Sequence, residues 1–400
     1  MRTETVTDYF PGHVMSSATT TPVPVARCVV AMVGTYPPTE CGLATFTSSL
    51  ASAITDGSAG WRVIVVRVLG APEVEIHQEV VAHWISGDPD SLVNVVLAIE
   101  SADVVVLQHE YGLFGGRDGE DVLALLEDLR VPLIVVLHSV LSNPSPRQRH
   151  IIDELVSCAA RIVVQSEHAR RRLVEHYSIR LAHVDVVAHG AAENFLDDSA
   201  TLSRVPNILT WGLLGPGKGI EHAIEAVAQL ANHDPVPVYR VVGATHPKVL
   251  ALEGEKYRYS LQELSRSLGV EAHIEFDDGY RDWQSLRALV READVVLLPY
   301  DSIDQESSGV LVEALASGKP VIATMFPHAV ELLSDGAGLL VEQGDVGAMR
   351  GALERVLYEP GLAQEMCRCA RRDSAALLWP VIGEHYRTLI DDVLALERTS

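Results

Sequence analysis

The chain has 400 residues, and its 31 lysines and arginines against 54 aspartates and glutamates give a formal net charge of −23 at pH 7. A surface this acidic repels nucleic-acid phosphates and anionic lipids, which excludes broad electrostatic binding to either. Hydrophobic residues make up 48% of the chain and charged residues 21%. This balance predicts large buried cores and roughly two to three domains.

The apolar runs and the cysteines indicate a soluble, cytoplasmic protein without an integral membrane segment. The longest apolar runs, such as Val131–Leu137, are far shorter than the ~20 residues that cross a bilayer. The five cysteines are scattered and form no CxxC pair, which fits a reducing compartment. Residues 1–25 are rich in Thr, Ser and Pro and lack the features of a signal peptide, so we expect a disordered leader there.

The chain then alternates short β-branched runs with longer segments of helical period, a pattern typical of βαβ units and a mostly parallel sheet. A first domain is expected over residues 26–195, with strands at Cys28–Val33, Arg62–Val68, Asp103–Leu107, Pro132–Leu137, Ile162–Val164 and Val184–Val187. A second is expected over residues 203–378, with strands at Ile208–Trp211, Val238–Val242, His273–Phe276, Asp294–Leu298, Pro320–Thr324 and Gly338–Val341. The polar stretch between them, from Ala191 to Pro206, is interpreted as the linker.

Three amphipathic helices are expected after these strands, at Val346–Tyr358, Gly361–Leu377 and Val381–Leu396. Two doubly wound halves of similar size predict a cleft between them. Open α/β sheets bind ligands at the carboxyl ends of their strands, so the functional residues are expected in the loops that follow the strands.

Three of these loops carry the chemistry, and the first follows the strand at Cys28–Val33. Gly42 opens a helix whose free N–H groups could meet an anion or a sugar hydroxyl. An ordinary strand-to-helix turn is the alternative for this loop.

The second loop runs from Trp211 to Ile220. Gly212, Gly217 and Lys218 have the spacing of a P-loop, in which backbone amides and a lysine cradle phosphates. Gly219 replaces the Ser or Thr that holds Mg²⁺, so the sequence favours phosphate binding over magnesium-dependent NTP hydrolysis. A solvated lysine is the alternative.

In the third loop, Ser307, Ser308 and Gly309 are expected to open a helix and to offer hydroxyls and N–H groups to a phosphate. Glu313 lies one turn further along an otherwise apolar helix. A buried carboxylate needs a partner, and two ribose hydroxyls would serve as one. An ion pair with a nearby basic residue is the alternative.

Together these loops resemble the retaining glycosyltransferases of family 4 (glycosyl transferases group 1), which have the GT-B fold of two Rossmann-like domains facing a central cleft. The resemblance extends from about Val29 to Leu396 and fits a variant subgroup with GxLxxxGKG and SGxL motifs. It rests on PPxxCGxATF (37–46), LQHEYGLFGG (107–116), LHS (137–139), VAHG (187–190), GxxxxGKGIE (212–221), VGATHP (242–247) and SGVLVEALASGKPVIAT (308–324).

The resemblance implies a hexosyltransferase whose C-terminal half holds a nucleotide-sugar donor, UDP- or GDP-linked, and whose N-terminal half holds a small-molecule or glycan acceptor. It requires no separate cofactor. Lys218 and Gly217 would hold the diphosphate, the start of the helix at Ser307–Gly309 its phosphates, and Glu313 the ribose. Residues 379–398 would form a helix that returns to the N-terminal domain.

His138 matches the family histidine that lies near the anomeric carbon, and His109 is a second catalytic candidate. Gly42 would approach the donor phosphate or the acceptor through its backbone. Two positions depart from the family pattern: Leu213 stands where an arginine is common, and Gln305 where the first glutamate of the acidic pair is usual. Gln305 could still hydrogen-bond a sugar hydroxyl.

No metal site is expected, because Asp88-Pro89-Asp90, which has the DxD spacing, is interpreted as a surface turn. A sugar-nucleotide-binding protein without transfer activity stays open as an alternative, and so does a GT-B phosphorylase or epimerase. The identity of the sugar, the base and the acceptor stays open too, as does the oligomeric state.

Overall fold

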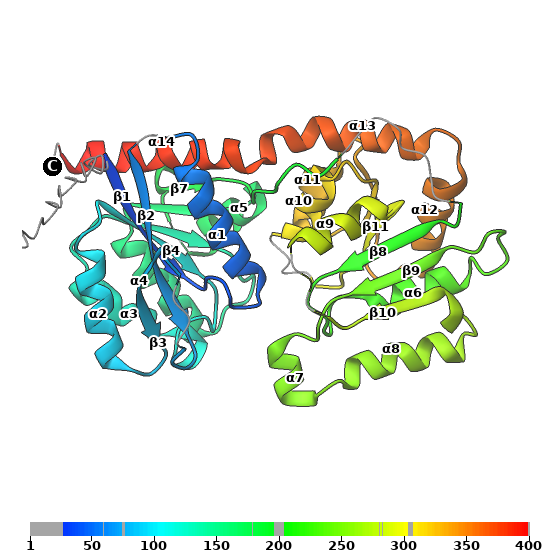
Figure 1. Ribbon diagram of the computed structural model, residues 1–400, viewed down its shortest axis with the longest axis horizontal. Coiled ribbons are helices and arrows are strands. Elements are labelled where there is room, and N and C mark those ends of the chain that lie inside the picture. Colours follow the sequence, from blue (N-terminus) through cyan, green and yellow to red (C-terminus); the bar gives the residue numbers. More distant parts are fainter. Residues whose placement is uncertain are drawn as a thin grey trace, which may run out of the picture.

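The computed structural model describes residues 27–398 without 59, 74–76, 178, 196–203, 280, 282 and 303–306. These residues form two parallel β-sheets, one in each half of the chain, with helices packed on their faces (Figure 1). The predicted fold class, two Rossmann-like doubly wound domains, is confirmed. The leader expected at residues 1–25 and the candidate Gln305 lie outside the described residues.

In the described part of the N-terminal half, seven parallel strands have the order β3-β2-β1-β4-β5-β6-β7. The strands are β1 (Cys28–Gly34), β2 (Trp61–Leu69), β3 (Val80–Ile85), β4 (Val104–His109), β5 (Leu133–Leu137), β6 (Arg161–Val164) and β7 (Val184–Val186). The helices are α1 (Gly42–Thr55), α2 (Pro89–Ile99), α3 (Val122–Asp128), α4 (Pro146–Cys158) and α5 (Glu167–Tyr177).

Two details of this half differ from the sequence prediction. Strand β3 was missed because it is an edge strand in which Trp84 alone is buried, so it lacks a continuous apolar run. Asp88-Pro89-Asp90 is the start of α2 rather than a turn, since Asp88 caps the helix and Pro89 is its first residue.

In the described part of the C-terminal half, six parallel strands have the order β10-β9-β8-β11-β12-β13. The strands are β8 (Asn207–Trp211), β9 (Val238–Val242), β10 (Ile274–Asp277), β11 (Val295–Leu298), β12 (Val321–Thr324) and β13 (Gly338–Val341). The helices are α6 (Ile220–Ala228), α7 (Pro247–Glu253), α8 (Lys256–Ser267), α9 (Trp283–Glu292), α10 (Gly309–Ala316), α11 (Pro327–Leu333), α12 (Val346–Tyr358), α13 (Leu362–Ser374) and α14 (Trp379–Glu397).

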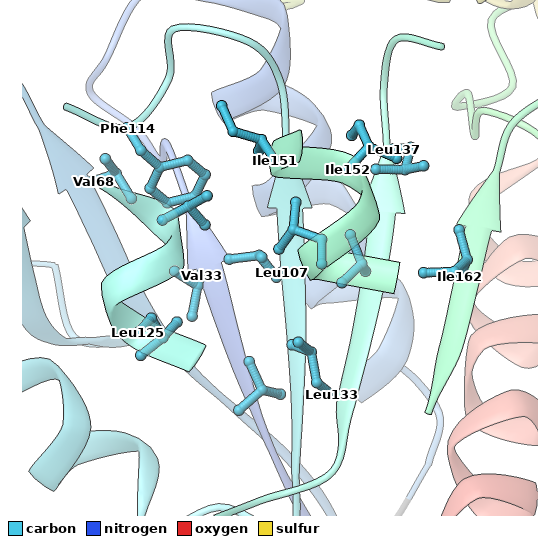
Figure 2. Packing of buried hydrophobic residues seen from close by; sticks show 14 of the residues in the cluster. Val33, Val68, Leu107, Phe114, Leu125, Leu133, Leu137, Ile151, Ile152 and Ile162 are labelled. Carbon is cyan, nitrogen blue, oxygen red and sulfur yellow. The ribbon is translucent and has the colours of Figure 1, made fainter. Parts of the chain in front are cut away.

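Apolar side chains fix the strands against the helices. Figure 2 shows Leu107 and Leu133 of the first sheet beside Leu125 of α3 and Ile151 of α4, and all four belong to one buried cluster. Burying one such side chain stabilises the fold by about 1.5–3 kcal/mol. This packing of the helices on the sheet fixes the strand ends and the loops that follow them.

Helix α14 joins the two halves, because it runs back from the C-terminal half and lies along α1 (Figure 1). Its Arg387 donates to the carbonyl oxygens of Ala53 and Ile54 at the end of α1, at 2.7 and 3.1 Å. Its first residue, Trp379, donates its N–H to Ala191 O at 3.0 Å. The chain passes between the two halves near Ala191 and again near Leu378, and these two segments lie side by side. A Cβ on Gly190 would lie 2.3 Å from the Trp379 ring, so this crossing requires glycine. Within the described residues, no helix has the length and apolarity to span a bilayer.

Candidate active site

Loops from the two halves meet at what we call the junction, defined by one hydrogen bond and by two glycines that lie close to a side chain of the other half. The Ser307 hydroxyl, just before α10, donates to the carbonyl oxygen of His138, just after β5, at 3.5 Å. A Cβ on Gly309 would lie 2.8 Å from Nε2 of His189, which follows β7. A Cβ on Gly112 would lie 2.8 Å from Nζ of Lys248 in α7. Residues that the sequence assigned to the two halves are therefore brought together here.

His138 is held on both sides of its ring at the junction. Its Nε2 lies 2.8 Å from Oε1 of Gln108, and its Nδ1 lies 3.1 Å from Nε2 of Gln165. The ring of Phe46 from α1 meets it edge-on, with centroids 4.8 Å apart. Burial lowers the pKa of His138 to about 3, and the neighbouring histidines add to this effect. The imidazole is therefore neutral at physiological pH.

The second histidine candidate, His109, is fully enclosed. None of its surface is exposed, and both ring nitrogens lack a hydrogen-bond partner among the described residues. Its ring meets that of Tyr111 edge-on at 5.2 Å, and burial lowers its pKa to about 4. A substrate could reach His109 only if the surrounding side chains moved.

Glu110 lies on the same side of the junction and has a fixed carboxylate. One oxygen accepts the Tyr111 N–H at 2.9 Å, and the other accepts the Ser139 hydroxyl at 2.6 Å. Burial raises the pKa of Glu110, while these bonds and the charge of Lys248 act against the rise. The N-terminal side of the junction thus contains an acidic group, Glu110, whose position is fixed by its hydrogen bonds to Tyr111 and Ser139.

On the C-terminal side, Lys218 lies in the loop between β8 and α6. Its ammonium lies 4.3 Å from the centroid of the Tyr300 ring, a cation–π contact. The carbonyl of Gly217 accepts the N–H of Asp301 at 3.1 Å, which ties this loop to the one after β11. The lysine therefore lies between the loops that follow β8 and β11.

The structure explains why a P-loop serine or threonine is missing after Lys218. Gly219 has φ of +62°, and a Cβ there would lie 1.8 Å from the carbonyl oxygen of Pro299. A side chain cannot be placed in this loop without moving the chain after β11. The position therefore has no hydroxyl that could bind Mg²⁺ as a P-loop does.

The start of α10 is capped from within the protein. Ser308, 4% exposed, accepts the Leu311 N–H through its hydroxyl oxygen at 3.2 Å. The N–H of Ser308 donates to Nδ1 of His328 at 2.9 Å. A ligand at this helix start would have to use other groups, such as the N–H of Gly309.

Glu313 lies one turn into α10 and faces a pocket that Asn194, Arg287 and Ser317 also line. Its Oε2 accepts the indole N–H of Trp211 at 3.3 Å. Burial raises the pKa of Glu313 to about 7, and the Trp211 hydrogen bond acts against the rise. The guanidinium of Arg287 donates to Asn194 Oδ1 at 3.0 Å, so this nearby base already has an acceptor.

Gly42 is the first residue of α1. One turn further along this helix, Phe46 contacts the ring of His138, so the start of α1 is near the junction. Apart from its chain neighbours and its own helix backbone, no atom lies within 4 Å of the position that a Cβ on Gly42 would take, so this side of the glycine is open to a ligand. The same is true of Gly217.

Sequence reasoning missed four residues of this site: Gln108, Gln165, Lys248 and His328. Each follows or ends a strand, or begins a short helix after one. Polar residues at strand ends were the available signal. Their partners lie on other elements, so the pairing itself could not be found from local sequence.

A family model described as Glycosyl transferases group 1 matches residues 193–373. The D-inositol 3-phosphate glycosyltransferase of Corynebacterium glutamicum is 30% identical over 298 residues, which cover 68% of this chain and 70% of that protein. Its counterpart in Corynebacterium diphtheriae is 28% identical over 298 residues, covering 68% of each chain.

Two solved structures illustrate the likeness of fold. Sucrose-phosphate synthase from Thermosynechococcus elongatus superposes with a TM-score of 0.74 at 19% identity, covering 92% of this chain and 100% of that one. Anabaena HepE in complex with UDP and glucose superposes with a TM-score of 0.74 at 18% identity, covering 91% of this chain and 100% of that one. The fold is that of GT-B glycosyltransferases.

Proposed function

Because this chain belongs to the glycosyl transferases group 1 family, we propose that it transfers a hexose from a nucleotide-sugar donor to a hydroxyl acceptor with retention of configuration. The observation that carries this proposal is the contact between the two halves at the junction, where Ser307 before α10 meets the carbonyl oxygen of His138. This contact brings the loop before α10 beside the candidate catalytic histidine of the other half.

The donor diphosphate lies between Lys218 and the start of α10. Cleavage of the glycosidic bond builds negative charge on this leaving group, and the ammonium and the helix dipole both favour that charge. Because this stabilisation is greater in the transition state than in the bound donor, it lowers the barrier. Gly217 and Gly42 contribute open backbone at the edges of the same space.

Glu313 binds the ribose of the donor through adjacent hydroxyls. Its raised pKa, about 7, reflects a buried carboxylate to which Trp211 gives an indole N–H. Two hydroxyl donors would favour the charged form and lower this pKa. Gln305 binds a sugar hydroxyl, and the donor base is uracil or guanine.

Transfer proceeds without a protein base, a metal or a separate cofactor. His138 is neutral and has a partner on each ring nitrogen, so it is poorly suited to take a proton. The acceptor hydroxyl attacks from the face that the leaving group vacates, and its proton passes to the departing phosphate. This route retains the anomeric configuration.

The acceptor binds to the N-terminal half, beside His138 and Glu110, and the protein works in solution in the cytoplasm. The relatives named D-inositol 3-phosphate glycosyltransferases make inositol phosphates the first acceptor class to test. The complex of HepE with UDP and glucose makes UDP-glucose the first donor to test.

A thermal-shift screen against UDP-, GDP- and ADP-sugars, followed by transfer assays on an acceptor panel, tests the proposal. A donor that binds the native state raises its apparent stability. We expect one donor class to stabilise the protein and to give a product whose anomeric configuration, read by NMR, matches that of the donor. Tight binding without turnover on any acceptor would instead indicate a sugar-nucleotide-binding protein. Magnesium-dependent release of phosphate from ATP or GTP would indicate an NTPase.

A further inference from the structure

Two glutamines contact the ring of His138 from opposite sides, and they come from the two strands that flank the strand before His138. Gln108 belongs to β4, His138 follows β5, and Gln165 follows β6. These strands lie side by side in the sheet, so the three side chains stand in a row at its carboxyl edge. The donor–acceptor distances are 2.8 Å to Gln108 and 3.1 Å to Gln165.

With Oε1 of Gln108 and Nε2 of Gln165 facing the ring, the two contacts are compatible with one tautomer of the imidazole. An amide oxygen can only accept, so Nε2 of His138 carries the hydrogen that Oε1 of Gln108 accepts. An amide nitrogen can only donate, so Nδ1 of His138 is bare and accepts from Gln165. The edge-on Phe46 ring then fixes the plane of the imidazole.

This arrangement is costly for the fold. Gln108 is fully buried and Gln165 is 3% exposed. Among the described residues, Nε2 of Gln108 and Oε1 of Gln165 have no hydrogen-bond partner. Each buried polar atom without a partner costs about 1–3 kcal/mol. Packing alone would favour apolar side chains at both positions, so the amides point to a task at His138.

We infer that Gln108 and Gln165 are positioning residues for the transfer reaction, which hold His138 as a neutral imidazole protonated on Nε2. The inference rests on the proposed function, which puts His138 near the anomeric carbon. That carbon gains positive charge in an oxocarbenium-like transition state, and an imidazolium beside it would repel this charge. Keeping the ring neutral and fixed therefore favours the transition state.

The other titratable groups near the ring do not disturb this state. His109 and His189 face His138 from the first sheet, and burial lowers the pKa of each to about 4. All three imidazoles are therefore neutral over the working pH range. No acidic group of the described residues is among the causes of the pKa shift of His138, so a carboxylate at either glutamine position would place a negative charge beside the ring.

The tautomer can be read directly from the free protein. We would label the histidines with ¹⁵N, identify the ring signals of His138 as those lost in His138→Gln, and record spectra from pH 5 to 9. We expect one protonated and one bare ring nitrogen, with the hydrogen on Nε2 and no titration. A hydrogen on Nδ1, or a ring that titrates near its ordinary pKa, would overturn the inference. This readout does not depend on finding the substrate.

Kinetics then separate positioning from packing. Gln165→Met should lower kcat by on the order of 10²-fold with little change in donor KM, because the reacting geometry is lost and the donor site is not. Gln108→Glu should raise the pKa of His138 and give kcat a new ionisation. Gln229→Met, at an exposed position after α6, is the control and should match wild type.

Two kinetic results would refute the positioning role. One is unchanged kcat and pH profile in both variants. The other is an equal loss of kcat and of donor affinity in folded protein. If no donor and acceptor give transfer with wild type, the proposed function fails instead, and the NMR spectrum still decides the tautomer.

Discussion

The two sides of the junction differ in how their polar groups are satisfied. On the N-terminal side, His138 has a partner on each ring nitrogen, and Glu110 accepts a hydrogen bond on each oxygen. On the C-terminal side, the Lys218 ammonium rests on the Tyr300 ring, and Glu313 is bonded to the indole of Trp211. His138 and Glu110 are thus satisfied by the protein itself, whereas Lys218 and Glu313 can still gain hydrogen bonds from a ligand.

This difference suggests a division of labour. Side chains that are already hydrogen-bonded keep a fixed position and a fixed protonation state, which suits residues that line the site where the sugar reacts. Groups with free charge gain more from a ligand, which suits the binding of a diphosphate and a ribose. Changes on the C-terminal side should therefore act on donor binding, and for Lys218 on turnover as well, whereas changes on the N-terminal side should act on turnover alone.

The largest effect is expected from Lys218→Ala, which removes the cation on the diphosphate. We expect kcat/KM to fall by about 10²–10³-fold while the fold persists, since the loss of one preorganised group at a developing anion has this size. The measurement is steady-state transfer with the best donor. Lys256→Ala, at an exposed position in α8, is the matched control. Near-normal kcat/KM would remove Lys218 from the mechanism.

The next effect is expected from Glu313→Ala. Donor affinity should fall by about 10–10²-fold, because hydrogen bonds to a charged group contribute about 1.5–3 kcal/mol. The turnover of bound donor should change much less. Calorimetric titration with the nucleotide measures the affinity, and an unchanged dissociation constant would contradict the ribose assignment.

A smaller effect concerns stability. The folded protein raises the pKa of Glu313 from 4.5 to about 7 through burial, so the stabilising effect of its neutral form is complete below about pH 4.5 and is lost as the pH rises through 7. Glu313→Gln removes this dependence. Relative to the variant, wild type should lose about 1–2 kcal/mol between pH 5 and 8, after allowance for partial exposure. The measurement is the free energy of unfolding of wild type and of Glu313→Gln at both pH values. The same difference between the two proteins at pH 5 and pH 8 would contradict a buried carboxylate with a raised pKa.

The smallest effect tests how the two sides are held together. Glu331 of α11 accepts the N–H groups of Glu167 and His168 at the start of α5, at 3.0 and 3.3 Å. Glu331→Ala should cost about 1 kcal/mol and speed hydrogen exchange in the first turn of α5. Glu263→Ala, which breaks an exposed ion pair in α8, should leave this exchange unchanged. Equal exchange in both variants would mean that the contact does not hold the halves together.

Much of the fold could be predicted from the sequence because parallel strands are buried on both faces. Strands such as β5 and β11 are then continuous apolar runs that the sequence displays. The edge strand β3 could not be found in this way. The helix starts at Gly42 and Gly309 could be predicted because glycine, serine and a change of period mark them.

The donor side of the site was also accessible to sequence reasoning, because Lys218, Ser308 and Glu313 each stand out in their own loop or helix. The other side was not. His109 attracted attention as a motif residue, yet its neighbour Gln108 is the one that contacts His138, since successive strand residues point to opposite faces. Only the strand order reveals that pair.

The most direct test compares Lys218→Ala with Gln165→Met in two measurements on the same samples: nucleotide affinity by calorimetric titration and kcat for transfer. The division of labour predicts that Lys218→Ala weakens nucleotide binding strongly, while Gln165→Met binds the nucleotide as wild type does and loses turnover. Equal nucleotide affinity in Lys218→Ala and wild type, or a loss of affinity in Gln165→Met as large as its loss of kcat, would contradict it.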